Sequence, residues 1–280
     1  MGNPTEAGGA PPQAYGRAGP PPYAATEDAT GYAVPSYEAV PSGASTSTSG
    51  VAGVSNRFPQ SLNAYFPKIK LSKNFHLGEH ADNKLFAVTM HTGMTSNPML
   101  ELHSGPSHSD PVIATADNES KWGSSKKSVL QVTPAGSSSG SRQTIRMNQQ
   151  SNWTNVQYPF SVEVGLGKDV RQEDFEWRRT GGGELRELDK WVGHGWKLVQ
   201  LGSSATGQGG ERAVRSPGAT SDGLEVVAVF SQSSSISISI SKVFKFRFLE
   251  SGATGVLGDA FAQAAVVGAL KIWYVEFTSN

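Results

Sequence analysis

Between about residues 60 and 250, short runs in which apolar and polar residues alternate are separated by clusters of Gly, Ser, Asn and Pro. Successive side chains of a β-strand point to opposite faces, so this pattern predicts consecutive strands joined by turns. Helical repeats are missing between the runs, which favours an antiparallel sheet over a doubly wound α/β fold. About twelve runs fit the pattern: Lys68 to Leu71, Phe75 to Glu79, Leu85 to His91, Met99 to His103, Val112 to Ala116, Ser128 to Thr133, Arg142 to Gln149, Pro159 to Leu166, Phe175 to Thr180, Trp196 to Gly202, Leu224 to Ser231 and Ile236 to Leu249.

The run from Ile236 to Leu249 alternates most regularly, and only Lys242 interrupts its apolar face. Alternation of this kind belongs to an antiparallel strand with one buried and one solvated face. Many strands without intervening helices predict a sandwich or a barrel, and closing a barrel also removes exposed strand edges. The apolar face consists of Ile236, Ile238, Ile240, Phe244, Phe246 and Phe248, and the polar face of Ser237, Ser239, Ser241, Lys245 and Arg247.

The segment from Val256 to Phe277 decides between a sandwich and a barrel. Its few polar residues are spread around a helix instead of gathered on one face, as expected for a helix that is buried or lies in a membrane. Several small residues keep the helix slim enough to fit inside a barrel. We therefore expect a helix over about residues 255–275, buried in a closed antiparallel barrel. The polar residues are Asp259, Gln263, Lys271 and Glu276, and the small ones Ala262, Ala264, Ala265, Gly268 and Ala269.

A transmembrane span is the alternative for this helix. A span needs about twenty apolar residues, whereas the uninterrupted apolar stretch here is Ala264 to Leu270. Asp259 and Lys271 would each cost about 2.5–3.5 kcal/mol near the bilayer centre. Thr254 can instead cap a buried helix, with Asp259 in the first turn, where negative charge suits the helix dipole. We favour the buried helix.

The first 57 residues consist largely of Gly, Pro, Ala, Ser and Thr, without strand or helix periodicity. Such a segment cannot offset its ordering entropy, so we expect a disordered tail over residues 1–57 and one barrel domain over residues 58–280. The N-terminus lacks the basic and apolar regions of a secretory signal. Within the tail, Pro20, Pro21, Pro22 and Tyr23 form a Pro-Pro-x-Tyr motif, which WW domains bind as a polyproline II helix.

Composition excludes several kinds of function. Lys plus Arg equals Asp plus Glu at 24 each, which argues against a general nucleic-acid-binding protein. The absence of Cys excludes disulfides and zinc-thiolate sites and fits a reducing compartment. We expect a cytoplasmic protein that can attach peripherally to a membrane and that needs no cofactor.

Three motifs of enzymes occur in the wrong context. Gly136 to Gly140 matches Gly-x-Ser-x-Gly, but a nucleophile elbow needs a helix after it, and here a strand is predicted to follow. His76 and His80 have the spacing of a metal pair on a helix, yet they lie in a predicted strand, so we expect no metal. Gly165 to Lys168 lacks the spacing of a phosphate-binding loop. We expect no enzymatic activity.

Three segments resemble the tubby C-terminal-like superfamily, which includes tubby proteins, phospholipid scramblases and LURP-one-related proteins. They are Phe175 to Thr180, Gly195 to Val199 and Ser251 to Gly255, and they look most like the tubby-like proteins common in filamentous fungi. The resemblance covers about residues 60–280. It implies a barrel around an apolar C-terminal helix. Scramblases also carry a Pro-rich tail, but their lipidated cysteine cluster has no counterpart in this chain.

Tubby domains bind phosphoinositides through basic residues of the barrel surface, where neighbouring cations chelate phosphate oxygens. Lys245 and Arg247 lie two residues apart on the outward face of the last predicted strand, and Arg142 and Arg146 form a similar pair. The alternative interpretation is a simple solvated strand face. We expect a non-enzymatic protein that binds anionic phospholipids or phosphoinositides through these cations. The alternative function is an adaptor whose tail recruits WW-domain proteins.

Overall fold

The computed structural model describes residues 58–67, 74–91, 95–120, 125–134, 141–151, 155–190, 192–204, 218–232 and 244–279. The predicted tail, the run from Lys68 to Leu71 and residues 236–243 lie outside these ranges. The described strands are β1 (Ser61–Tyr65), β2 (Asn74–His80), β3 (Asn83–Met90), β4 (Leu100–His103), β5 (Val112–Asn118), β6 (Lys127–Val132), β7 (Gln143–Asn148), β8 (Gln150–Ser151), β9 (Val156–Val164), β10 (Arg171–Thr180), β11 (Gly195–Ser204), β12 (Leu224–Gln232) and β13 (Phe244–Phe248).

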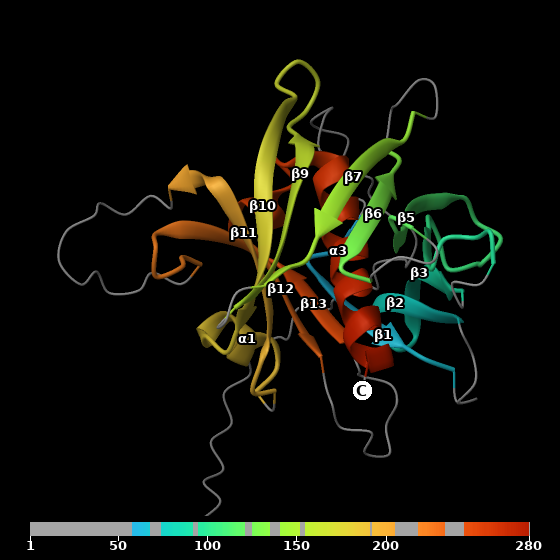
Figure 1. Cartoon of the computed structure of the whole chain (residues 1–280). Helices are drawn as coiled ribbons and strands as arrows, with labels where there is room; N and C mark the ends of the chain where they lie inside the picture. The colour runs from blue at the N-terminus through green and yellow to red at the C-terminus, as the bar shows by residue number, and fades with distance from the viewer. Residues whose placement is uncertain are drawn as a thin grey trace, which may run out of the picture. The chain divides into compact units, whose positions relative to one another are not determined.

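The thirteen strands form one antiparallel sheet that curls into a nearly closed barrel (Figure 1). The strand order is β7-β6-β5-β4-β3-β2-β1-β13-β12-β11-β10-β9-β8. At the seam, β7 lies next to β9, and the short β8 pairs with the beginning of β9. The predicted antiparallel barrel is therefore confirmed.

Each predicted run that falls on described residues overlaps a strand, but β1, β8 and the two short helices α1 (Gly183–Leu188) and α2 (Glu250–Thr254) were not predicted. β1 buries only Leu62 and Ala64, and its stability comes from pairing with both β2 and β13. Both unpredicted helices are short: α1 buries only Leu185, and α2 buries no residue. Elements of this kind carry too few apolar positions to be recognised from periodicity.

Two helices end the chain: α2 (Glu250–Thr254) and α3 (Gly258–Ser279). Thr254 does not cap the long helix, as expected from the sequence, because it ends α2 and its hydroxyl donates to the Ser251 carbonyl at 2.9 Å. α3 begins instead at Gly258, whose φ of +81° favours glycine. A Cβ there would lie 2.6 Å from the Gly165 carbonyl oxygen, so the loop after β9 also requires glycine at this position.

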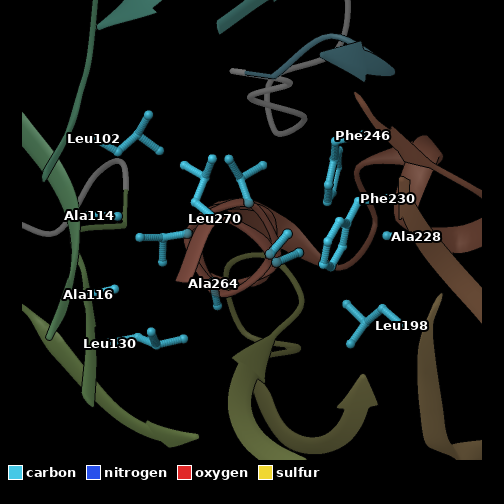
Figure 2. Packing of buried hydrophobic residues seen from close by; sticks show 14 of the residues in the cluster. Leu102, Ala114, Ala116, Leu130, Leu198, Ala228, Phe230, Phe246, Ala264 and Leu270 are labelled. Atoms are coloured by element: carbon cyan, nitrogen blue, oxygen red, sulfur yellow. The ribbon is translucent and has the colours of Figure 1, made fainter. Parts of the chain in front are cut away.

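α3 passes through the middle of the barrel, as predicted (Figure 1). The helix over residues 258–278 is long and apolar enough to cross a membrane, but 67% of its most apolar 18-residue stretch is buried inside the protein. Figure 2 shows Ala264 and Leu270 of α3 between two walls of the barrel. The labelled residues of one wall are Leu102, Ala114, Ala116 and Leu130, and those of the other Leu198, Ala228, Phe230 and Phe246.

Two buried polar residues hold α3 in place. The Gln263 side chain accepts from the Thr133 backbone N–H and donates to the Thr133 carbonyl, each at 2.8 Å, and so pairs with the backbone at the end of β6. The Lys271 Nζ donates to Asn118 Oδ1 at 2.7 Å and lies 3.2 Å from Met99 Sδ. These contacts fix the height and the rotation of the helix in the barrel.

Candidate functional site

A cavity of about 350 Å³ opens at the end of the barrel where α3 finishes, and we call it the mouth pocket. β10 and β12 end at this side of the barrel, and β9 and β11 begin there, so residues far apart in the sequence meet around the last turn of α3. Six of the eight lining residues have polar side chains. The lining residues are Gln149, Val156, Tyr158, Arg179, His194, Gln232, Val275 and Glu276.

The guanidinium of Arg179 lies between a carboxylate and an aromatic ring. It donates through Nη2 to Glu276 Oε1, and its Cζ lies 5.1 Å from the ring centroid of Trp196. Trp196 in turn donates through Nε1 to Glu276 Oε2 at 3.4 Å. The Trp196 residue is 1% exposed and the Glu276 side chain 16%, whereas the Arg179 side chain is 49% exposed. A half-exposed cation thus rests on one buried ring and one partly buried carboxylate.

Tyr158 forms another side of the pocket. Its hydroxyl donates to Gln149 Oε1 at 3.4 Å, and its ring packs edge-on against Trp196 at 5.3 Å. Burial raises the pKa of Tyr158 to about 12, and the negative charge of Glu276 adds to this effect while Arg179 opposes it. The phenol therefore keeps its proton at neutral pH and acts as a hydrogen-bond donor.

Gln232 brings a buried acceptor to the same pocket. Its Oε1 has no hydrogen-bond partner among the described residues. A buried acceptor left in this state costs about 1–3 kcal/mol, which a ligand with an N–H or O–H group would recover. Around the ion pair, the pocket thus offers donors and acceptors that suit a small polar group, and its volume lies at the lower end of the range for small-molecule sites.

The predicted basic pairs lie on strands that are far apart in the sheet. Lys245 and Arg247 lie on β13, in the middle of the strand order. Arg146 lies on β7, at one end of that order, and Arg142 directly precedes β7. Lys245 Nζ is paired with Asp189 Oδ2 at 2.7 Å, and the Arg146 Nε lies 3.3 Å from a Glu119 carboxylate oxygen. The four cations therefore do not converge on one site.

Of the remaining motifs, the structure describes the histidines of β2 but not the two glycine- and proline-rich motifs. His76 and His80 lie on strand β2, as expected, and the His76 ring contacts His108, with ring centroids 5.3 Å apart. Among the described residues, no group of three or more His, Cys, Asp or Glu side chains is arranged to hold a metal ion. Gly136 to Gly140 and the motif from Pro20 to Tyr23 lie outside the described residues.

Sequence reasoning missed the mouth pocket, although the lining residue Arg179 and the ring beneath it, Trp196, lie in segments already singled out. Arg179 belongs to the segment Phe175 to Thr180 and Trp196 to the segment Gly195 to Val199. The two residues are direct partners in the ladder between β10 and β11. The sequence does not reveal that Arg179 and Trp196 are paired, because the register between two strands cannot be read from either segment alone.

No protein-family model, no curated protein and no solved structure matches this chain. The chemistry of the site is therefore derived from its own geometry.

Proposed function

We propose that this chain is a non-enzymatic, tubby-like binding protein that recognises phospholipid headgroups at a membrane surface through the mouth pocket. The observation that carries the proposal is a pocket with a half-exposed arginine at the end of the barrel. The last turn of α3, which lines this pocket through Glu276, also carries an exposed aromatic residue. The expected localisation, cytoplasmic with peripheral attachment to membranes, belongs to the same proposal.

The size and the charge of the pocket favour a headgroup. A volume of about 350 Å³ accommodates a small polar group, but not a lipid with its acyl chains. The guanidinium of Arg179 has the donor geometry that suits phosphate oxygens. The acyl chains would remain in the membrane.

The aromatic residue beside the pocket is Phe277. It is 55% exposed, and its ring stacks on the buried Trp273 at 5.3 Å. Aromatic rings are favoured at the level of lipid headgroups. Glu276 lines the pocket and Phe277 is the next residue of α3, so insertion of Phe277 would bring the pocket to the headgroup region.

The fold supports the proposed family, because a barrel around a C-terminal helix is what membership of the tubby C-terminal-like superfamily implies. The basic residues Lys245 and Arg247, predicted from the sequence to bind anionic lipids, lie on β13 and not in the mouth pocket. The tail motif from Pro20 to Tyr23 remains a prediction from sequence, and recruitment of WW-domain proteins is compatible with membrane binding.

Flotation of the full chain with liposomes tests the proposal. Vesicles of phosphatidylcholine and phosphatidylethanolamine, with and without phosphoinositides, are compared at two salt concentrations. We expect Arg179→Ala and Phe277→Ser each to reduce binding at least about fivefold, and the control Lys245→Ala/Arg247→Ala to leave it unchanged. Binding to no vesicle would contradict the proposal, and loss of binding only in the Lys245/Arg247 variant would move the site to β13.

A further inference from the structure

Glu276, which lines the mouth pocket, and Trp196, which is buried behind Arg179, form a cation site that the chain's own arginine occupies. The Glu276 carboxylate and the Trp196 ring both favour a positive charge. The C-terminal end of a helix also attracts cations, yet the last turn of α3 contains no basic residue of its own. Arg179 supplies this charge from β10.

The arginine is the exchangeable member of this arrangement. Its side chain is 49% exposed and is attached to the penultimate residue of β10, so it can turn towards solvent without moving the barrel. Glu276 and Trp196 are held by burial. Departure of Arg179 would leave the Glu276 carboxylate, which is only 16% exposed, without its cation. Only a ligand that brings a positive charge can therefore take the place of Arg179.

A second observation points to the kind of cation. Gln232 lines the same pocket, and its side-chain Oε1 is buried and without a partner among the described residues. A primary ammonium group beside Glu276 has further N–H groups to offer an acceptor such as this oxygen, whereas a quaternary ammonium group has no N–H to donate. The released guanidinium of Arg179 needs an anion, and phosphate suits it.

Building on the proposed function, we propose that the mouth pocket takes an aminoalkyl phosphate of the phosphoethanolamine type. Its ammonium group replaces the Arg179 guanidinium between Glu276 and Trp196, and Arg179 turns to the phosphate. The ligand thus exchanges one internal ion pair for two, one at each of its ends. A phosphate without an ammonium group gains only the contact with Arg179.

Calorimetric titration of the full chain with soluble probes tests this inference. The probes are phosphoethanolamine, phosphocholine and glycerol 3-phosphate. We expect phosphoethanolamine to bind most tightly and Glu276→Gln to weaken it about thirtyfold, without weakening glycerol 3-phosphate. The matched control is Glu176→Gln, which removes the carboxylate paired with the neighbouring Arg178 at 2.6 Å, away from the pocket. This control should bind like the wild type.

A second variant keeps the test valid even where Glu276→Gln perturbs folding. Gln232→Met removes an acceptor that has no partner in the part of the chain that the structure describes, so the fold should tolerate it. We expect about fivefold weaker binding of phosphoethanolamine and unchanged binding of phosphocholine. Equal binding of phosphoethanolamine and glycerol 3-phosphate, or no effect of either variant on phosphoethanolamine, would overturn the inference.

Vesicles separate this inference from the proposed function. Flotation that requires phosphatidylethanolamine and is lost in Glu276→Gln supports both. Flotation on anionic vesicles that is unchanged in Glu276→Gln leaves membrane binding standing and overturns the inference. If the protein binds free phosphoethanolamine but does not float with any vesicle, the ammonium site is supported, and the proposal that the ligand is a membrane lipid is contradicted.

Discussion

Lys271 shows how a charged side chain is accommodated inside the barrel. It is fully buried, and it reaches Asn118 Oδ1 at 2.7 Å. Burial lowers the pKa of Lys271 from 10.5 to about 8, although the nearby Asp117 carboxylate opposes the effect. The charged form is thus less favourable in the folded chain than in the unfolded one.

Stability should therefore rise as the pH increases above 8. In this range the unfolded lysine still holds a proton that the folded lysine has released, so the unfolded state binds more protons. The full effect would be roughly 3 kcal/mol, and part of it appears between pH 8 and 9.5. Urea unfolding of the wild type and of Lys271→Met measures the slope. The variant should lose it, and an equal slope in both proteins would contradict the assigned burial.

Three histidines form a cluster on β2, β4 and the loop after β4. The rings of His103 and His108 lie 5.7 Å apart, and the Thr89 hydroxyl is 3.0 Å from a ring nitrogen of each. Burial lowers the pKa of His108, as do the positive charges of His76 and His103. The pKa of His76 is lowered by burial and by the Lys84 charge.

Acidification should destabilise the chain through this cluster. A lowered pKa in the folded state means that the unfolded chain binds more protons, so stability is lost as the pH falls below about 6.5. Unfolding of the wild type and of His108→Gln at pH 7.5 and pH 5.5 measures the loss. His108→Gln should lose less stability on acidification, whereas His80→Gln, a control on the same strand β2, should behave like the wild type. The opposite order would exclude the cluster as the source.

At the scale of elements, the pairing of Gln263 with Thr133 joins α3 to the end of β6. Both hydrogen bonds, at 2.8 Å, are made with backbone groups beyond the last strand residue. Gln263→Leu keeps the apolar bulk but leaves the Thr133 N–H and carbonyl without this partner. We expect a loss of about 2–4 kcal/mol in the free energy of unfolding. Chemical denaturation measures it, with the exposed Gln172→Leu on β10 as the control.

The sequence predicted elements well where one strand or helix contains the whole signal. In β13, the buried Phe244, Phe246 and Phe248 alternate with two basic residues, and in α3 apolar residues surround the helix. β1 and α1 contain too few buried residues to be recognised in this way. The start of α3 was misplaced because the Gly258 backbone and the loop after β9 determine it, not the capping potential of Thr254.

At the scale of the whole molecule, α3 fills the barrel and leaves the ends and the outer surface for binding. The mouth pocket combines residues from β9, β10, β12 and α3, which only the barrel topology brings together. Its residues could not be predicted, because each of them alone resembles an ordinary strand or helix residue. The outer cations, by contrast, were predictable from alternation, but their carboxylate partners were not.

The tail adds a prediction that is independent of the barrel. If Pro20 to Tyr23 binds WW domains, Tyr23→Ala in the full chain should abolish capture by an immobilised WW domain, because the tyrosine is the defining residue of the motif. Tyr15→Ala, in the same Pro-rich segment, is the matched control. Equal capture of both variants would show that the motif is not used. Vesicle flotation should be the same for both.

The central claim is that a phospholipid headgroup enters the mouth pocket beside Arg179. The most direct measurement is nuclear magnetic resonance of the Trp196 indole N–H and the arginine Nε–H groups during titration with a short-chain phosphatidylethanolamine. The account predicts shifts at Trp196 and Arg179 and none at Arg178, which lies on the other face of β10. Shifts confined to Arg142, Arg146 and Arg247, or no shifts at all, would contradict it.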